Sequence, residues 1–307
     1  MMNLFHKKDQ YQGYNIYSVK KYVDKKRIIF TTIIVILIII TLGFIIYYSV
    51  DTTIRLKNAK RFEQKLIEYE SKQEELQKQE RERQAKIPKL TDEGKQNIKG
   101  IYKSETKRVF LTFDDGPSVN TADVLDILKS NDIKATFFVL GTQVEKMPEM
   151  VKRAYQEGHY IANHGYSHQY SQIYSSPETV LQEFNQCNSA VAKAIDVPEY
   201  NSHLFRFPGG SVGGKYANLK AEAVTLLEQN NIMHVDWNAL TGDAEKSSPD
   251  EEYLMNNLQK TTQNKNSIVI LMHDAQAKRV TVEFLPKLIE FFQQQGYQFE
   301  NFYSIIK

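Results

Sequence analysis

The last two hundred or so residues of the chain alternate between short apolar runs and amphipathic segments of helical length. The apolar runs are Val109–Phe113, Ala135–Leu140, Tyr160–Asn163, Leu204–Phe207, Met233–Trp237, Ile268–Met272 and Tyr297–Phe302. The amphipathic segments are Thr121–Lys129, Pro148–Gln156, Pro177–Ala194, Ala217–Gln229, Asp250–Thr262 and Val280–Gln295. Because apolar strands that alternate with helices form parallel sheets with covered faces, the pattern predicts an α/β fold. About seven parallel strands fit a distorted or incomplete (β/α) barrel, and an open doubly wound sheet is the alternative.

Polar residues follow the predicted strands at the points where they end. Asp114 and Asp115 follow the first strand, His164 the third, Arg206 and Pro208 the fourth, Asp243 the fifth and His273 the sixth. Barrel active sites are assembled at the C-terminal ends of the strands. The sequence therefore predicts that these side chains meet at one end of the sheet.

Asp115, His164 and His168 together offer a carboxylate and two imidazoles. Three protein ligands with an open fourth position are typical of a catalytic zinc site, although cobalt or nickel fits the same ligands. Such a metal lowers the pKa of water and polarises a carbonyl oxygen. The alternative is that both histidines only pack in a tyrosine-rich loop. The other histidines, which are interpreted as structural or exposed, are His6, His159, His203 and His234.

The remaining polar residues at the strand ends can divide the proton transfers between them. Asp114 is free to act as a general base if Asp115 binds metal, and Arg206 can pair with Asp114 and set its pKa. His273 can protonate a leaving nitrogen. A base and an acid that flank a metal site are what hydrolysis of an amide requires.

Five segments carry these residues in order along the chain. They are Thr112–Pro117, Asn163–His168, Arg206–Gly210, Asp236–Ala244 and Leu271–His273. From about Lys107 to Lys307, the chain resembles the polysaccharide deacetylase family, also called the NodB-homology or carbohydrate esterase family 4 domain, whose five motifs these segments match. The resemblance implies Asp114 as base, Asp115, His164 and His168 as metal ligands, and His273 as acid.

The resemblance also implies residues that contact or position the substrate. Gly209 stands where the family usually has an aromatic residue whose backbone N–H holds the oxyanion, and a glycine keeps that N–H. Leu271 would line the acetyl pocket, and Pro208 and Trp237 would belong to the substrate groove. Asp243 would orient Arg206. Ala244 replaces a usual tryptophan, which leaves one pocket wall without a residue assigned to it.

The implied function is metal-dependent removal of N-acetyl groups from a cell-wall polysaccharide, with N-acetylglucosamine of peptidoglycan as the leading hypothesis. The alternatives within the same class are N-acetylmuramic acid, another polysaccharide, or an O-acetyl ester as substrate. From a different class, the domain could be a glycan-binding scaffold without catalysis. The intact set of acids and histidines argues against the scaffold.

Ile28 to Tyr48 is an apolar run of 21 residues without a charged side chain. This length spans the hydrocarbon core of a bilayer as a helix. A secretory signal peptide is the alternative, but Tyr47 and Tyr48 make a poor cleavage site, so an uncleaved anchor is predicted. The basic cluster at residues 25–27 favours a cytoplasmic tail over residues 1–27. An extracellular substrate would place the catalytic domain outside the cell membrane.

Residues 49–100 are predicted to form a helical stalk before a domain at residues 101–307. From Asp51 to Pro88 the chain is rich in strong helix formers, with no glycine and no earlier proline. Its apolar seam is interrupted, so a solvated stalk and a weak dimer both remain open. The formal net charge of +2 gives no reason to expect nucleic acid as a partner, and the single Cys187 excludes an intrachain disulfide.

Overall fold

The computed structural model describes residues 25–306, and its folded domain is built on one curled parallel sheet. Hydrogen bonds order the strands β5-β4-β3-β2-β1-β7-β6, with β8 also paired to β1, and every pair is parallel. The strands are β1 (Arg108–Asp114), β2 (Thr136–Val139), β3 (Tyr160–Asn163), β4 (Leu204–Phe205), β5 (Met233–His234), β6 (Ala239–Leu240), β7 (Ser267–His273) and β8 (Gln298–Glu300).

The two edges of this sheet, β5 and β6, are neighbours in the sequence. The order follows that of a barrel with a break between them, so the prediction of an incomplete (β/α) barrel is confirmed. The prediction of one strand over the apolar run Met233–Trp237 is wrong in its extent, because β5 covers only the first two of these residues. Strand β5 ends at His234, and residues 235–238 lead without a helix to β6, which begins at Ala239 and pairs with β7 at the other edge of the sheet. Within residues 25–306, seven strands follow one another in this order and β8 pairs with β1 beside them, which agrees with the prediction of about seven parallel strands.

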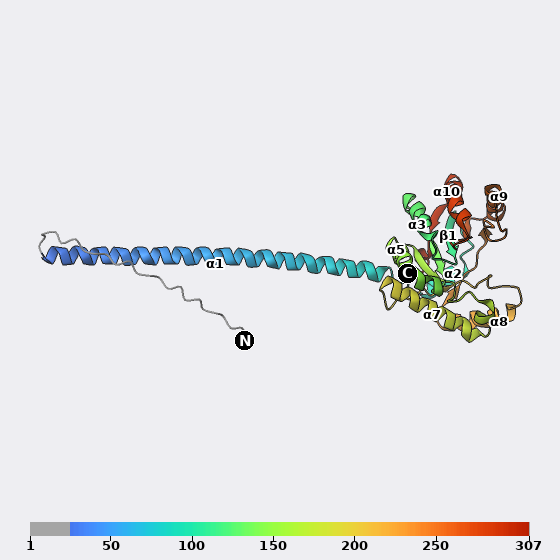
Figure 1. The fold of residues 1–307 in the computed structure, drawn as a ribbon, viewed down its shortest axis with the longest axis horizontal. Coiled ribbons are helices and arrows are strands. Elements are labelled where there is room, and N and C mark those ends of the chain that lie inside the picture. Colours follow the sequence, from blue (N-terminus) through green and yellow to red (C-terminus); the bar gives the residue numbers. More distant parts are fainter. Residues whose placement is uncertain (1–24, 307) are drawn as a thin grey trace. The chain divides into compact units, whose positions relative to one another are not determined.

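Helices cover the outer face of the sheet (Figure 1). Six of them follow one another around it in the order α9, α10, α3, α5, α7, α8, each in contact with the next. The helices of the domain are α2 (Asp92–Lys99), α3 (Thr121–Ser130), α4 (Gly141–Lys146), α5 (Pro148–Gln156), α6 (Tyr170–Ile173), α7 (Pro177–Ile195), α8 (Ala217–Gln229), α9 (Glu251–Thr262) and α10 (Arg279–Gln294), with a 3₁₀ turn at Phe302–Ser304.

Successive side chains of β1 belong alternately to two hydrophobic cores, one between the sheet and the helices and one on the inner face of the sheet. Val109, Leu111 and Phe113 pack with residues of the helices, whereas Phe110 packs with inward residues of other strands and with Phe302 near the C-terminus. Because successive strand residues point to opposite faces, Thr112 and Asp114 share the inner face with Phe110. The inner core therefore ends in polar side chains at the C-terminal end of β1, where the site lies.

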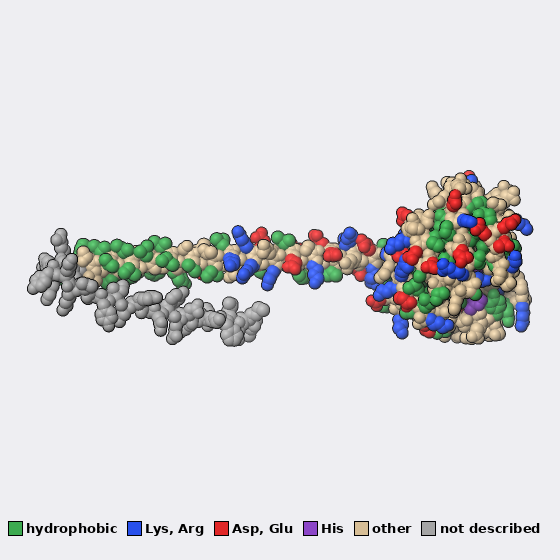
Figure 2. Space-filling model, turned by 45° about the horizontal axis from the view of Figure 1, so that its top comes forward, with side chains coloured by type: hydrophobic (Ala, Val, Ile, Leu, Met, Phe, Trp, Pro, Cys, Tyr) green, Lys and Arg blue, Asp and Glu red, His purple; other side chains and the backbone are tan. Residues whose placement is uncertain are grey.

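The helix α1 (Lys25–Ala85) contains the predicted membrane segment and most of the predicted stalk in one continuous element. Its first part is long and apolar enough to cross a membrane, with a mean hydropathy of 3.1 in the best window. Hydrophobic side chains cover this part and charged ones appear further along (Figure 2). Most of the predicted cytoplasmic tail, including His6, lies outside the described residues.

The compact unit that holds the sheet extends from Lys78 to the C-terminus. Its first residues are part of its core, since Ile87, Leu90 and Ile98 are buried. Thr91 caps α2 by accepting the Gly94 N–H. The structure thus places the start of the folded unit before residue 101, the boundary drawn from the sequence.

Candidate active site

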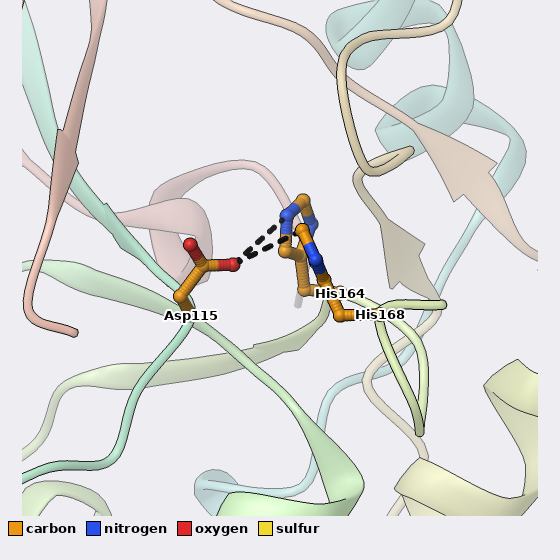
Figure 3. A group of neighbouring side chains, drawn as sticks. All are labelled: Asp115, His164 and His168. Carbon is orange, nitrogen blue, oxygen red and sulfur yellow. Dashed lines mark ion pairs between the residues drawn. The ribbon is translucent and has the colours of Figure 1, made fainter. Parts of the chain in front are cut away.

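Asp115, His164 and His168 meet at the C-terminal ends of β1 and β3 (Figure 3). Asp115 Oδ1 lies 3.6 Å from His164 Nε2 and 3.4 Å from His168 Nε2. One candidate ligand atom from each residue lies within 4.8 Å of the others. Figure 3 shows both imidazoles turned toward the same carboxylate oxygen, which is the arrangement of a three-ligand site.

The state of these atoms fits a metal cation. Asp115 Oδ1 is buried and has no hydrogen-bond partner within residues 25–306, and a buried carboxylate oxygen without one is costly. His164 Nδ1 lies 2.8 Å from the carbonyl oxygen of Arg206, so it carries the proton and leaves the Nε2 lone pair free. Burial lowers the pKa of His164 to about 3, although Asp115 opposes this shift. His164 is therefore neutral, as a metal ligand must be.

Two of the three candidate ligands occupy backbone conformations that residues other than glycine seldom adopt. The φ angle is 72° at Asp115 and 59° at His168, both in the left-handed region. Such conformations cost free energy and persist where the surroundings impose them. At Asp115 they allow the chain to turn directly after Asp114, so that two neighbouring carboxylates face different partners.

Glu183 of α7 holds the loop that carries both histidines. Its Oε2 accepts the backbone N–H groups of Tyr166 and Ser167 at 2.6 and 2.7 Å, and Oε1 accepts the Ser167 hydroxyl at 2.7 Å. The side chain is almost fully buried. Hydrogen bonds to a charged acceptor are stronger than neutral ones, so Glu183 fixes the backbone between the two ligands.

Asp114 lies beside the ligand group and is paired with Arg206. Arg206 Nη1 donates to Asp114 Oδ1 at 2.9 Å and to Thr112 Oγ1 at 2.7 Å, and both charged side chains are buried. Asp114 Oδ2 lies 3.8 Å from His164 Nε2. Burial raises the pKa of Asp114, and the Arg206 guanidinium opposes that rise. A carboxyl with such a pKa takes up a proton more readily than an exposed one.

The expected role of Asp243 as the residue that orients Arg206 requires correction. Asp243 Oδ1 lies 3.0 Å from His273 Nδ1, and its Oδ2 accepts the His273 backbone N–H at 2.8 Å. The reason is the sheet order: Asp243 follows β6, which pairs with β7 and therefore ends beside His273. Arg206 follows β4 and is held by Thr112, Asp114 and the backbone oxygens of residues 235 and 236.

A cavity of about 350 Å³ opens above these groups. Its lining includes the ligand trio, Asp114, Asp243 and His273, together with Gly209, Trp237 and Leu271 from the substrate-contacting set expected from the sequence. Pro208 does not line the cavity, and its carbonyl oxygen accepts the Tyr174 hydroxyl at 2.7 Å. Eleven residues were singled out in the sequence. Nine of them line the cavity, and Arg206 joins them as the buried partner of Asp114. Pro208 is the one that stands apart.

Sequence reasoning missed several residues that shape the site. Glu183 had a usable signal, because it falls on the apolar stripe of α7 with Val180, Phe184 and Cys187. An acid at a buried helix position needs partners, which points to a structural role. Tyr170 and Glu245 also line the cavity, but Tyr170 begins the four-residue helix α6 and Glu245 lies in a turn, and neither segment is long enough to show a periodicity.

Comparison with known proteins gives one consistent result. A family model for polysaccharide deacetylases matches residues 102–226. The putative polysaccharide deacetylase YheN of Bacillus subtilis is 36% identical over 198 residues, which cover 63% of this chain and 66% of that protein. A peptidoglycan-N-acetylglucosamine deacetylase of Bacillus cereus is 33% identical over 205 residues, which cover 65% of this chain and 71% of that protein.

The fold is similar to solved structures as well. The structure of a Streptococcus mutans CE4 esterase superposes with a TM-score of 0.62 at 30% identity, over 67% of this chain and 90% of the other. The shared part is thus nearly the whole of that structure. About a third of this chain has no counterpart in these relatives, and the match to the family model begins at residue 102.

Proposed function

Because this chain belongs to the polysaccharide deacetylase family, we propose that it hydrolyses N-acetyl groups of a cell-wall glycan in a metal-dependent reaction. The observation that carries this proposal is the placement of one metal-ligand trio, one carboxylate and one histidine around a single cavity. Asp114 and His273 serve as base and acid. Asp115, His164 and His168 would hold the metal, with zinc preferred and cobalt or nickel as alternatives.

The chemistry divides between the metal and the residues of the chain. A divalent cation, when bound by the trio, supplies Lewis acidity that activates water and polarises the acetyl carbonyl. Asp114 Oδ2, next to the trio, accepts the proton of the attacking water, while Arg206 keeps the carboxylate in place. The Gly209 N–H lines the cavity and has no acceptor among the described residues, so it can donate to the developing oxyanion.

His273 completes the reaction as general acid. Burial alone would lower its pKa, but the hydrogen bond and charge of Asp243 outweigh burial and raise the pKa to about 9. The imidazole is therefore protonated at neutral pH. Its Nδ1 is held by Asp243, and Nε2 is left to protonate the nitrogen as the C–N bond breaks. Acetate and a free amine are the products.

The proposed substrate is the N-acetylglucosamine of peptidoglycan, which is the activity named for the Bacillus cereus relative. N-acetylmuramic acid, another polysaccharide and an O-acetyl ester are the alternative substrates. The proposed setting is the outer face of the cell membrane. The apolar first part of α1 would be a single-pass anchor with its N-terminus in the cytoplasm, and the rest of α1 would be a stalk that could also support a weak dimer.

The test uses the full chain in detergent, loaded with zinc and incubated with defined muropeptides. Mass spectrometry of the products locates each lost acetyl group on glucosamine or muramic acid, and acetate is measured in parallel. The His164→Ala variant is the inactive control. Loss of acetyl from N-acetylglucosamine supports the proposal, and loss only from muramic acid or from O-acetyl groups would replace it by one of the alternatives.

The scaffold hypothesis makes the opposite prediction in the same experiment. A glycan-binding protein without catalysis would retain muropeptides but release no acetate at any zinc concentration. Accessibility of the domain to protease in intact cells tests the location separately. Protection of the domain from external protease would contradict the extracellular placement without affecting the enzymatic proposal.

A further inference from the structure

Aromatic side chains occupy the space beside two consecutive glycines of the site, Gly209 and Gly210. A Cβ atom on Gly209 would lie 2.7 Å from the Tyr170 hydroxyl oxygen, a distance that real Cβ atoms essentially never show. A Cβ atom on Gly210 would lie 3.4 Å from Cη2 of Trp237. Both rings line the cavity above the ligand trio. The wall of the site at this point is therefore built by side chains from other segments.

Tyr170 is held in place by its ring rather than by its hydroxyl. The ring centroid lies 5.5 Å from that of His168 and 5.7 Å from that of Tyr174. Tyr174 is in turn fixed, since its hydroxyl donates to the Pro208 carbonyl oxygen at 2.7 Å. The aromatic stack thus connects the metal-ligand loop to the segment that precedes Gly209.

The hydroxyl of Tyr170 remains available to a ligand. It has no hydrogen-bond partner among residues 25–306, whereas the hydroxyls of Tyr160, Tyr174 and Tyr200 each donate to a backbone carbonyl. Tyr170 is 43% exposed, so its ring is packed on one side and open on the other. A tyrosine in this position presents an apolar surface together with a polar tip, which suits a sugar ring with its hydroxyl groups.

We propose that Tyr170 is a specificity-determining residue that contacts the sugar bearing the acetyl group, and that Gly209 is required to make room for it. The phenol donates to or accepts from a sugar oxygen, and the open part of the ring packs against the sugar. This inference rests on the proposed function for the identity of the ligand. It differs from that function in assigning recognition to a segment outside the Arg206–Gly210 turn.

The test measures binding as well as turnover, with the zinc-loaded full chain in detergent and tetra-N-acetylchitotetraose as probe. Tyr170→Phe keeps the ring and removes the hydroxyl, so the dissociation constant and KM should each rise about two- to tenfold, as the loss of one hydrogen bond predicts. Tyr170→Ala should raise them further. Tyr166→Phe is the matched control, because Tyr166 lies in the histidine loop, does not line the cavity, and donates its hydroxyl to Glu145 of α4.

A metal-directed probe separates recognition of the sugar from damage to the metal site. Acetohydroxamate binds a metal without a sugar, and its affinity for Tyr170→Phe should stay within about twofold of wild type, with zinc content unchanged. Unchanged tetrasaccharide affinity in both Tyr170 variants would overturn the inference. Equal losses for both probes together with lost zinc would also overturn it, because Tyr170 would then support His168 instead of the sugar.

A double-mutant cycle tests the steric link to Gly209. Gly209→Ala should weaken tetrasaccharide binding strongly in the wild-type background and less in the Tyr170→Ala background. Additive effects would contradict the shared space. Because binding and acetate release are measured separately, a wild-type chain that binds the tetrasaccharide through Tyr170 but releases no acetate would refute the proposed function and leave this inference standing.

Discussion

His273 Nδ1 lies 3.0 Å from Asp243 Oδ1, and the backbone N–H of His273 donates to the second oxygen of the same carboxylate at 2.8 Å. The carboxylate also accepts the Thr281 hydroxyl at 2.7 Å, so Asp243 is fully engaged. This pair joins the end of β7 to the segment after β6. It sets the protonation of His273, because the carboxylate reverses the lowering of its pKa that burial alone would cause.

Replacement of Asp243 by asparagine should shift the pH dependence of the reaction. With a raised pKa of about 9, wild-type His273 remains protonated as pH rises and loses its proton only through that value. In Asp243→Asn, burial is no longer opposed by a charge, so the pKa of His273 should fall below its ordinary value of about 6.5. The alkaline limb of kcat/KM should therefore move down by at least two pH units.

Thr281→Val is the matched control for this measurement, since it removes one hydrogen bond from Asp243 and no charge. Its alkaline limb should move far less. An alkaline limb that is identical in wild type and Asp243→Asn would exclude His273 as the titrating acid.

The same pair makes the stability of the fold depend on pH. Because the pKa of His273 is raised on folding, the pair with Asp243 contributes its full stabilisation below about pH 6.5. This stabilisation is lost as pH rises through about 9.

The two neighbouring acids should respond differently to the same substitution. Asp115→Asn should lose zinc and activity together, because its Oδ1 faces both histidines. Asp114→Asn should retain zinc and lose about 10²–10⁴-fold in kcat, the usual contribution of a general base. Elemental analysis and kinetics with excess zinc distinguish the two. Rescue of Asp114→Asn by zinc would mean that the roles are exchanged.

Glu183 should matter for metal affinity although it touches no metal. Glu183→Ala leaves two backbone N–H groups and one hydroxyl without their acceptor, so the loop between His164 and His168 should loosen. The dissociation constant for zinc should rise about 10–100-fold, as for other residues that orient ligands. Glu183→Gln, which keeps one acceptor oxygen, should be intermediate.

The control for Glu183 is Gln182→Ala, an exposed neighbour on the same helix. Its zinc affinity, measured by competition with a chelating dye, should equal that of wild type. If Glu183→Ala bound zinc as tightly as the control while remaining folded, the loop would be fixed by other contacts.

Removal of residues 1–77 should leave a stable domain, and the further removal of residues 78–100 should destabilise it. The shorter fragment lacks Ile87, Leu90 and Ile98, each of which contributes about 1.5–3 kcal/mol by burial. It also lacks the Lys86 carbonyl that accepts the Tyr303 hydroxyl at 2.7 Å. Thermal unfolding of fragment 101–307 should occur on the order of 10 °C below that of fragment 78–307. Equal midpoints would show that this segment does not contribute to the core.

The main features of the fold were accessible from the sequence because buried parallel strands leave continuous apolar runs. Runs such as Val109–Phe113 and Ile268–Met272 match β1 and β7 closely. The break in the barrel was not accessible. Strands β5 and β6 have two residues each, and nothing in Met233–Trp237 marks where the chain changes from one edge to the other.

The residues of the site also fall into a group that could be predicted from the sequence and a group that could not. The meeting of Asp114, Asp115, His164 and His273 was predictable because each lies at the C-terminal end of a parallel strand, and these ends come together at one side of the barrel. The partner of Asp243 was not, because it depends on which strand lies beside β7. Tyr170 was missed for a related reason: it begins the short helix α6, and its position against Gly209 depends on how that helix lies beside a distant segment.

The mutual exclusion of Gly209 and Tyr170 also restricts how this protein can change over generations. A Cβ atom at residue 209 would lie 2.7 Å from the Tyr170 hydroxyl oxygen, so Tyr170 would have to move, and the new residue would need a backbone φ near 75°. A lineage descended from this sequence can therefore acquire a bulky residue at 209 only after Tyr170 has been lost or displaced. The two positions should then covary among relatives, with one aromatic residue at either position but not at both.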